Sequence, residues 1–214
     1  RDSLQHQPLK PQTRRPDELN IGFINIQGLG KKEAEVEATM NRHHIQVMGL
    51  VETWQRQTGW IQLSHGTRYE QGHQAARGIA VQYPDTTQIQ PREPQTADHR
   101  LSVHLQWGIK TVLHLHTIYW PSRKTGLQDW LEAIITTQAN AAFPQVIQGD
   151  FNQNLDTPAM KAMLAKHGMT LHPNPPQWTW QSAGTGKRAN LDWFIVSEMI
   201  RVKDCTVTNE HPIH

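Results

Sequence analysis

Apolar residues recur in short runs along most of the chain, and the length of these runs favours strands over helices. Runs of four to eight apolar or alternating residues between turn signals are typical of β-strands. A nearly continuous apolar run such as 45–51 indicates a strand buried on both faces. The predicted strands are Leu19–Ile26, Ile45–Val51, Gly78–Tyr83, Leu101–Trp107, Thr111–Tyr119, Gln145–Asp150, Gln177–Gln181, Asp192–Val196 and Lys203–Thr208.

Three segments have helical spacing instead. Lys31–His43 places its few apolar residues among charged positions, and Gly126–Ala141 repeats large apolar residues every three or four positions. The third helix has clear boundaries, with Thr157 as N-cap, Pro158 at the first helical position and Gly168 just past the end. Many strands with few helices between them predict an α/β fold, in which two mainly antiparallel sheets pack face to face with helices outside. This arrangement is a four-layer α/β sandwich.

Residues 1–18 differ from the rest of the chain. They contain Pro8, Pro11 and Pro16 and have no apolar periodicity, which is typical of a flexible linker or tail. A basic arm that touches phosphate is the alternative, but four basic residues against three acidic ones make it a weak one. We expect a single domain over residues 19–214.

The composition limits the class of protein. Hydrophobic residues make up 36% of the chain, the mean hydropathy is −0.65 and the formal charge is only +2. Any affinity for nucleic acid must therefore come from a local patch. The single Cys205 excludes an internal disulfide and favours a reducing, intracellular compartment. No run reaches the roughly 20 apolar residues that cross a bilayer, so we expect no membrane partner.

Polar residues stand at or near the ends of several predicted strands. In Gln148-Gly149-Asp150-Phe151-Asn152 a carboxylate and a carboxamide follow a buried run, where side chains can converge on a ligand. Taken alone, such a Gly-Asp-x-Asn stretch is equally typical of a turn. The other residues placed in this way are Asn25, Glu52, Tyr119, Asp192 and His211.

Glu52 is the best candidate for a metal ligand. It closes an apolar strand, and a carboxylate in that position needs a cation or another partner. Mg²⁺ binds through one or two carboxylates together with water and phosphate oxygens, which suits so small a set of ligands, and Mn²⁺ is an alternative. The other interpretation of Glu52 is an ordinary residue at a strand end.

These segments, in this order, resemble the endonuclease/exonuclease/phosphatase superfamily, the fold shared by apurinic endonucleases, DNase I and inositol-phosphate phosphatases. The resemblance covers residues 19–214 and implies a DNase I-like, metal-dependent phosphodiesterase. It implies that Asp150 orients or deprotonates the attacking water, that Asn152 holds the phosphate, and that His211 donates a hydrogen bond or a proton to it.

The resemblance implies supporting roles for further residues. Tyr119 and Asn25 contribute a phenol and an amide to the phosphate site, and Asp192 orients the histidine or supports the metal. Glu210 stands where relatives have an aspartate beside the histidine, so here it is the histidine-orienting residue. Each side chain also has a structural alternative, such as a packed strand aromatic for Tyr119 and a turn residue for Asn25.

Two departures from the family pattern concern the metal site. Many relatives have an aspartate at the position of Gln27, and many have Ser-Arg where this chain has Ala189-Asn190. Both departures leave the number of metal ions open.

Two further histidines lie outside the family pattern. His114 and His116 share one face of a predicted strand, with the two-residue spacing of some zinc sites. Without a third ligand, solvent-facing or hydrogen-bonded strand histidines are the favoured interpretation.

The basic residues give a weaker indication of the substrate. Lys187 and Arg188 lie in a glycine-rich loop before Asp192, and Arg123 and Lys124 follow Tyr119. Contacts to DNA phosphates are the functional interpretation, and a solvated hairpin is the alternative.

Within the superfamily, the segments 20–29, 47–54 and 179–182 are most similar to the endonuclease domain of LINE-type (non-LTR) retrotransposons. The resemblance implies a domain that nicks double-stranded DNA, leaves a 3′-hydroxyl, and is joined to a reverse transcriptase. A chain that begins with Arg and ends just past His211 fits a domain excised from such a polyprotein, monomeric when isolated and nuclear in a eukaryote. The alternatives are a phosphoesterase acting on abasic DNA, a phosphoinositide or a phospholipid, and an inactive DNA-binding module.

Overall fold

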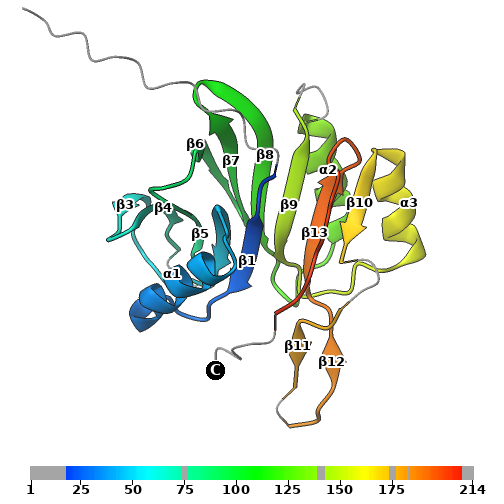
Figure 1. Cartoon of the computed structure of the whole chain (residues 1–214). Helices are drawn as coiled ribbons and strands as arrows, with labels where there is room; N and C mark the ends of the chain where they lie inside the picture. Colours follow the sequence, from blue (N-terminus) through cyan, green and yellow to red (C-terminus); the bar gives the residue numbers. More distant parts are fainter. Residues whose placement is uncertain (1–17, 74–76, 139–142, 174–176, 183, 209–214) are drawn as a thin grey trace, which may run out of the picture.

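The computed structural model describes residues 18–73, 77–138, 143–173, 177–182 and 184–208, and Figure 1 shows their arrangement. Two large sheets pack against each other, and a small two-stranded hairpin projects from one end of them. Helices lie on the outer faces of the sheets. The predicted four-layer α/β sandwich is confirmed.

The first sheet has five strands in the order β1-β2-β5-β4-β3. Its β1 and β2 are parallel, and all its other neighbouring pairs are antiparallel. The bounds are Ile21–Asn25 for β1, Val47–Val51 for β2, Gly59–Gln62 for β3, Gly66–Gln71 for β4 and Ile79–Pro84 for β5.

The second sheet has six strands in the order β10-β13-β9-β8-β7-β6, and only β8 and β9 are parallel. The bounds are Ile89–Ala97 for β6, Arg100–Trp107 for β7, Lys110–Tyr119 for β8, Gln145–Asp150 for β9, Met169–His172 for β10 and Asp192–Ser197 for β13. The projecting hairpin pairs β11 (Trp180–Gln181) with β12 (Arg188–Ala189).

The helices begin close to where the sequence predicts. A short 3-10 turn, η1 (Gly30–Lys32), leads into α1 (Glu33–Arg42), and α2 spans Leu127–Gln138. The third helix, α3, spans Pro158–Lys166. Its predicted cap is confirmed, because the Thr157 hydroxyl accepts a hydrogen bond from the Met160 amide at 3.2 Å.

Three layers of apolar side chains separate the four layers of secondary structure. Side chains from α1 pack on the outer face of the first sheet, and side chains from α2 and α3 pack on the outer face of the second. The middle layer lies between the sheets, which come very close at Gly49. A Cβ added there would lie 2.2 Å from the Gln148 amide nitrogen on β9, so only glycine allows this approach.

Several strand predictions need correction. Lys203–Thr208 is not a strand, although its apolar residues alternate; the Val207 amide bonds to the Gln177 side chain at 2.9 Å instead of a neighbouring strand. Gln177–Gln181 shortens to the two residues of β11. Strands β3, β4, β6, β10 and β12 were not predicted.

His114 and His116 are buried on β8 rather than facing solvent. The Nδ1 atom of His116 lies 2.8 Å from the Ser102 hydroxyl on β7, and the ring of His114 stacks on that of His104. His116 is therefore a hydrogen-bonded strand histidine, and His114 is a buried, stacked one. Over the described ranges, no helix combines the length and the apolar character needed to cross a membrane.

Candidate active site

Four of the predicted site residues point between the two sheets. Side chains alternate along a strand, so residues two positions apart share a face. Asn25 thus lies on the same face as Phe23, Tyr119 as Leu115, Asp150 as Val146, and Asp192 as Val196. The second residue of each pair packs in the apolar layer between the sheets. The polar residues continue that inner face at the strand ends.

Strand pairing brings these ends together. Asp150 is the direct neighbour of Tyr119 on one side and of Asp192 on the other. Asn25 on β1 pairs with Val51, the residue before Glu52. Because the two sheets face each other, the ends of β1 and β2 meet the ends of β8, β9 and β13 at one edge of the sandwich.

Asn25 connects two carboxylates across the sheets. Its Nδ2 atom donates to Glu52 Oε1 at 3.1 Å and to Asp150 Oδ2 at 2.9 Å. Its Oδ1 atom accepts from the Gln27 amide at 3.2 Å, which fixes the orientation of the amide group. The structure therefore brings together three residues that lie far apart in the sequence.

A tight turn positions the second predicted pair. The Asn152 amide donates to Asp150 Oδ1 at 2.9 Å, and the Asn152 side-chain amide donates to the Trp120 carbonyl at 2.9 Å. Asn152 has a φ of 49°, a left-handed conformation that is uncommon outside glycine. The turn interpretation of this motif is confirmed, and the turn holds Asp150 and Asn152 in place, whereas their predicted catalytic roles stay predictions.

Glu52 has the same unusual backbone, with a φ of 54°. Strained residues of this kind cluster at functional sites, where the surrounding structure holds them in place. The Glu52 carboxylate also lies close enough to the Tyr119 phenol to change its pKa. Burial and the charge of Glu52 raise the pKa of Tyr119, so the phenol keeps its proton and can serve as a donor.

The two aspartates on β9 and β13 have raised pKa values. Burial raises the pKa of Asp150 to about 6, assisted by the charge of Glu52 and opposed by the hydrogen bonds from Asn25 and Asn152. Burial and the neighbouring Asp150 raise the pKa of Asp192 to about 8, and a hydrogen bond with Thr179 opposes this. Several carboxylates crowded at one strand edge thus favour a positive partner.

Basic groups border the cluster next to Tyr119. The Arg77 guanidinium lies 5.9 Å from the centre of the Tyr119 ring, and Lys124 Nζ lies 4.8 Å from that of Trp120. His99 packs edge-on against Trp120, and Arg123 is exposed on the same loop as Lys124. Arg77 was not predicted, because a basic residue before a strand gives no signal in the sequence.

The other predicted substrate contacts lie on the projecting hairpin. Lys187 and Arg188 are exposed, and Arg188 stacks over Trp178 with its guanidinium 4.4 Å from the ring centre. Trp178 and Trp180 are themselves exposed, at 36% and 45%. The hairpin therefore presents exposed charges and flat aromatic faces, but it lies beside the carboxylate cluster and not within it.

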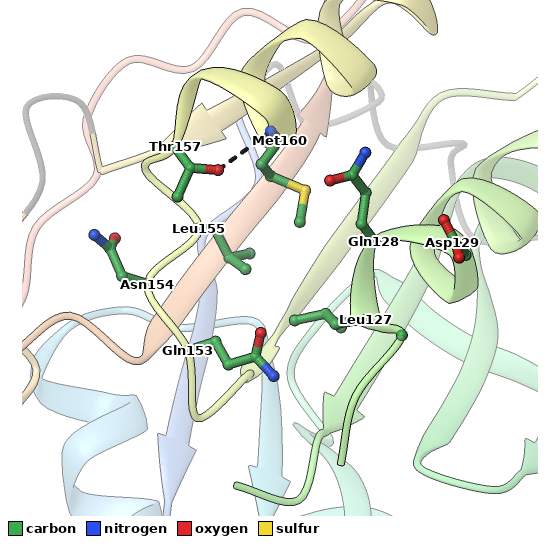
Figure 2. Close-up of a pocket in the computed structure, with 9 residues that line it drawn as sticks. Leu127, Gln128, Asp129, Gln153, Asn154, Leu155, Thr157 and Met160 are labelled. Carbon is green, nitrogen blue, oxygen red and sulfur yellow. Dashed lines mark hydrogen bonds between the residues drawn. The ribbon is translucent and has the colours of Figure 1, made fainter. Parts of the chain in front are cut away.

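A pocket of about 290 Å³ opens beside the site, and Figure 2 shows its lining. It lies between the start of α2 and the segment that leads from Gln153 to the first turn of α3. None of the predicted catalytic residues lines this pocket. Its link to the site is Gln153, which lines the pocket and follows Asn152 in the chain.

The donor set of the site fits a hard divalent cation. Over the described part of the chain, no three His, Cys, Asp or Glu side chains converge as a metal cage made of protein alone. Mg²⁺ does not need such a cage, since one or two carboxylates with water and phosphate oxygens are enough. Glu52 and Asp150, bridged by Asn25, could hold such an ion.

His211 and Glu210 lie outside the described residues, so their predicted roles stay predictions. Thr179 was not predicted as a site residue, although it belongs to a segment that carries the family resemblance. Its hydroxyl accepts hydrogen bonds from the amides of Leu191 and Asp192 at 3.0 and 3.1 Å and so anchors the start of β13.

The fold is shared with several solved nucleases. A 3′-5′ exonuclease from Neisseria meningitidis superposes with a TM-score of 0.62 at 13% identity, covering 84% of this chain and 87% of that chain. An AP endonuclease from Archaeoglobus fulgidus superposes with a TM-score of 0.61 at 14% identity, and the match again covers 84% of this chain and 87% of that chain. The endonuclease domain of TRAS1, a telomere-specific non-LTR retrotransposon, gives 0.61 at 13% identity and covers 85% and 86%. The fold does not select one activity, since a mannosyl-6-phosphatase from Bacteroides thetaiotaomicron is also similar.

Comparison with curated protein sequences gave no match. The family model described as Endonuclease/Exonuclease/phosphatase family matches residues 20–213, nearly the whole described chain. Members of this family are hydrolases of phosphodiesters or phosphate esters. With this match and the arrangement of carboxylates at one edge of the sandwich, the chain belongs to the endonuclease/exonuclease/phosphatase family.

Proposed function

We propose that this chain is a divalent-metal-dependent endonuclease that nicks double-stranded DNA and leaves a 3′-hydroxyl. The observation that carries the proposal is the convergence of Asn25, Glu52, Tyr119 and Asp150 at one strand edge. This set supplies a carboxylate that can accept a proton, neutral donors for phosphate oxygens, and a carboxylate suited to Mg²⁺. Mn²⁺ is an alternative ion with the same ligand preference.

Each residue has a separate task in this proposal. Asp150 orients and deprotonates the attacking water, and its raised pKa makes it a stronger base than an ordinary aspartate. Tyr119 donates a hydrogen bond to a non-bridging oxygen of the phosphate. Asn25 has both amide hydrogens on Glu52 and Asp150, so it must release one of them to donate to the phosphate. Asn152 has one amide hydrogen on the Trp120 carbonyl and a second one for the substrate.

Glu52 is the residue that would hold the metal, with Asp150 beside it. The bound ion would place positive charge next to the phosphate oxygens and so stabilise the charge that develops there. Asp192 lies next to Asp150 on β13, where it orients His211 or supports the ion. His211, oriented by Glu210, donates a hydrogen bond or a proton to the phosphate.

DNA is the substrate that the surroundings of the site favour. Basic side chains border the carboxylate cluster at Arg77 and Lys124 on one side and at Lys187 and Arg188 on the hairpin. A long polyanion can contact both groups, whereas a small phosphomonoester would reach only one. The resemblance to LINE-type domains adds that the chain nicks target DNA for a covalently joined reverse transcriptase, as a nuclear monomeric domain with no membrane partner.

Three substrates compared side by side test the proposal. Supercoiled plasmid, an oligonucleotide with one abasic site, and a soluble phosphate monoester are each incubated with the protein and Mg²⁺. Nicking of intact plasmid, with ends that a DNA polymerase extends, is the expected result. Cleavage confined to the abasic oligonucleotide, or phosphate release without nicking, would contradict it and favour the corresponding alternative phosphoesterase.

A further inference from the structure

A buried ionic network lies directly behind the loop that carries Glu52. Glu70 and Arg68 on β4 are 0% and 2% exposed, which is rare for charged residues. Arg68 Nε lies 3.4 Å from Glu70 Oε2, and Arg68 Nη2 lies 2.9 Å from Glu33 Oε1 at the start of α1. The other oxygen of Glu70 accepts a hydrogen bond from the hydroxyl of Thr53, the residue after Glu52.

Thr53 fixes its segment with all of its polar groups. It is completely buried, its amide donates to the Gly78 carbonyl at 3.1 Å, and its carbonyl accepts from the Leu29 amide at 2.9 Å. The Glu52 carbonyl accepts from the Gly28 amide at 2.7 Å. These bonds hold the strained Glu52 backbone between the segment that follows Asn25 and the start of β5.

The start of β5 is shaped around the same contact. A Cβ added at Gly78 would lie 2.1 Å from the Thr53 hydroxyl oxygen and 2.8 Å from Glu70 Oε1. Only glycine leaves room for this hydrogen bond. An apolar pair in place of Glu70 and Arg68 would fill the space without the cost of burying charges. The retention of these charges points to a use besides packing.

We infer that Thr53 and Glu70 are positioning residues that hold Glu52 in its metal-binding conformation. The chain of contacts runs from α1 through Arg68 and Glu70 to the Thr53 hydroxyl, one residue from the predicted metal ligand. Neither side chain touches the substrate site. The inference rests on the proposed role of Glu52 and extends it to Thr53 and Glu70, which the sequence analysis did not place in the site.

Three variants separate positioning from simple stability. Thr53→Val keeps the shape of the side chain and removes the hydroxyl, while Thr53→Ser keeps the hydroxyl. Gly78→Ala pushes a methyl group against the same hydrogen bond. Ile135→Val on α2 serves as a matched control, because it lowers stability in a different apolar layer far from Glu52.

The first readout is Mn²⁺ affinity, measured from the loss of the free-ion electron paramagnetic resonance signal without DNA. We expect Thr53→Val and Gly78→Ala to weaken binding at least tenfold, and Thr53→Ser and Ile135→Val to stay within twofold of wild type. The second readout is hydrogen exchange at the Gly28 and Leu29 amides, which needs no metal. Exchange at these two amides should accelerate in Thr53→Val and Gly78→Ala. Exchange at Val81 in β5 should stay unchanged in both variants.

The outcomes distinguish this inference from the proposed function. Unchanged Mn²⁺ affinity and unchanged exchange in Thr53→Val, with only a lower melting temperature, would overturn the inference and reduce the network to a stabilising one. Accelerated exchange with unchanged Mn²⁺ affinity would overturn it as well, because the loop would move without affecting metal binding. A wild-type protein that binds Mn²⁺ but leaves plasmid intact would refute the nuclease proposal alone.

Discussion

Asn25 Nδ2 donates to Asp150 Oδ2 at 2.9 Å and to Glu52 Oε1 at 3.1 Å, so one amide nitrogen joins the two sheets at the site. The contact spans 125 residues of sequence. The Glu52 and Asp150 carboxylates carry like charges and repel each other, and the shared donor Asn25 holds them at a fixed separation.

The first prediction concerns this contact. Asn25→Ala removes the donor between Glu52 and Asp150, and we expect kcat for plasmid nicking to fall by about 10², the lower end of the effect of losing one oriented donor. The KM for DNA should change little, because we expect the basic side chains to supply most of the DNA affinity. Asn20→Ala, before the other end of β1, is the control and should match wild type. Equal losses in both variants would refute the role of Asn25.

The second prediction concerns the hairpin. Lys187→Ala and Arg188→Ala each remove one exposed charge, and each should reduce the slope of log affinity against log salt by about 0.9 if that charge contacts a phosphate. DNA binding measured over a salt series in EDTA gives the slopes. Lys110→Ala, at the end of β8 opposite to Tyr119, should leave the slope unchanged. An unchanged slope in the hairpin variants would indicate a solvated loop without DNA contacts.

A third prediction concerns stability in acid. Burial, with nearby Arg100, lowers the pKa of His116 from 6.5 to about 3, so below pH 6.5 the unfolded chain binds a proton that the folded protein excludes. The stability contribution of His116 is complete above pH 6.5 and falls as the pH drops toward 3, by up to about 1.4 kcal/mol per pH unit.

Replacing the pair Ser102 and His116 with Ala and Leu should remove this component of the pH dependence. Urea unfolding at pH 7, 6 and 5 measures it, and the variant should lose less free energy of unfolding than wild type between pH 6 and 5. If the free energy of unfolding fell equally with pH in the two proteins, His116 would have to take up a proton in the folded state.

A fourth prediction concerns the single cysteine. Burial and Asp204 raise the pKa of Cys205 to about 11, so at pH 8 only about one thiol in a thousand is ionised. Iodoacetamide should label the native protein far more slowly than the urea-unfolded protein, as followed by mass spectrometry. Similar rates in the two states would mean that residues around Cys205 open readily.

The sequence was most informative where a polar residue stands at one end of an apolar run. Asn25, Glu52, Tyr119, Asp150 and Asp192 all occupy such positions, and strand pairing brings those ends to one edge. The pattern could not show that Asn25 bridges the sheets, because that contact depends on how two separate sheets pack.

Edge strands were the hardest elements to predict. β6 pairs on one side only and contains Pro91 and Pro94, so it has little of the apolar alternation of a central strand. Lys203–Thr208 shows the opposite case, since its apolar residues alternate but the segment forms no strand. Thr53, Arg68 and Glu70 were missed because hydropathy does not reveal a buried ionic network in advance.

The most direct test of the proposed nuclease is nicking of supercoiled plasmid by wild type, Glu52→Ala and Asp150→Asn, each with Mg²⁺ and with EDTA. Circular dichroism first establishes that all three proteins are folded. We expect the wild type to nick only with Mg²⁺ and both variants to lose nicking. Equal nicking by folded wild type and Glu52→Ala, or nicking in EDTA, would contradict a metal-dependent site at this strand edge.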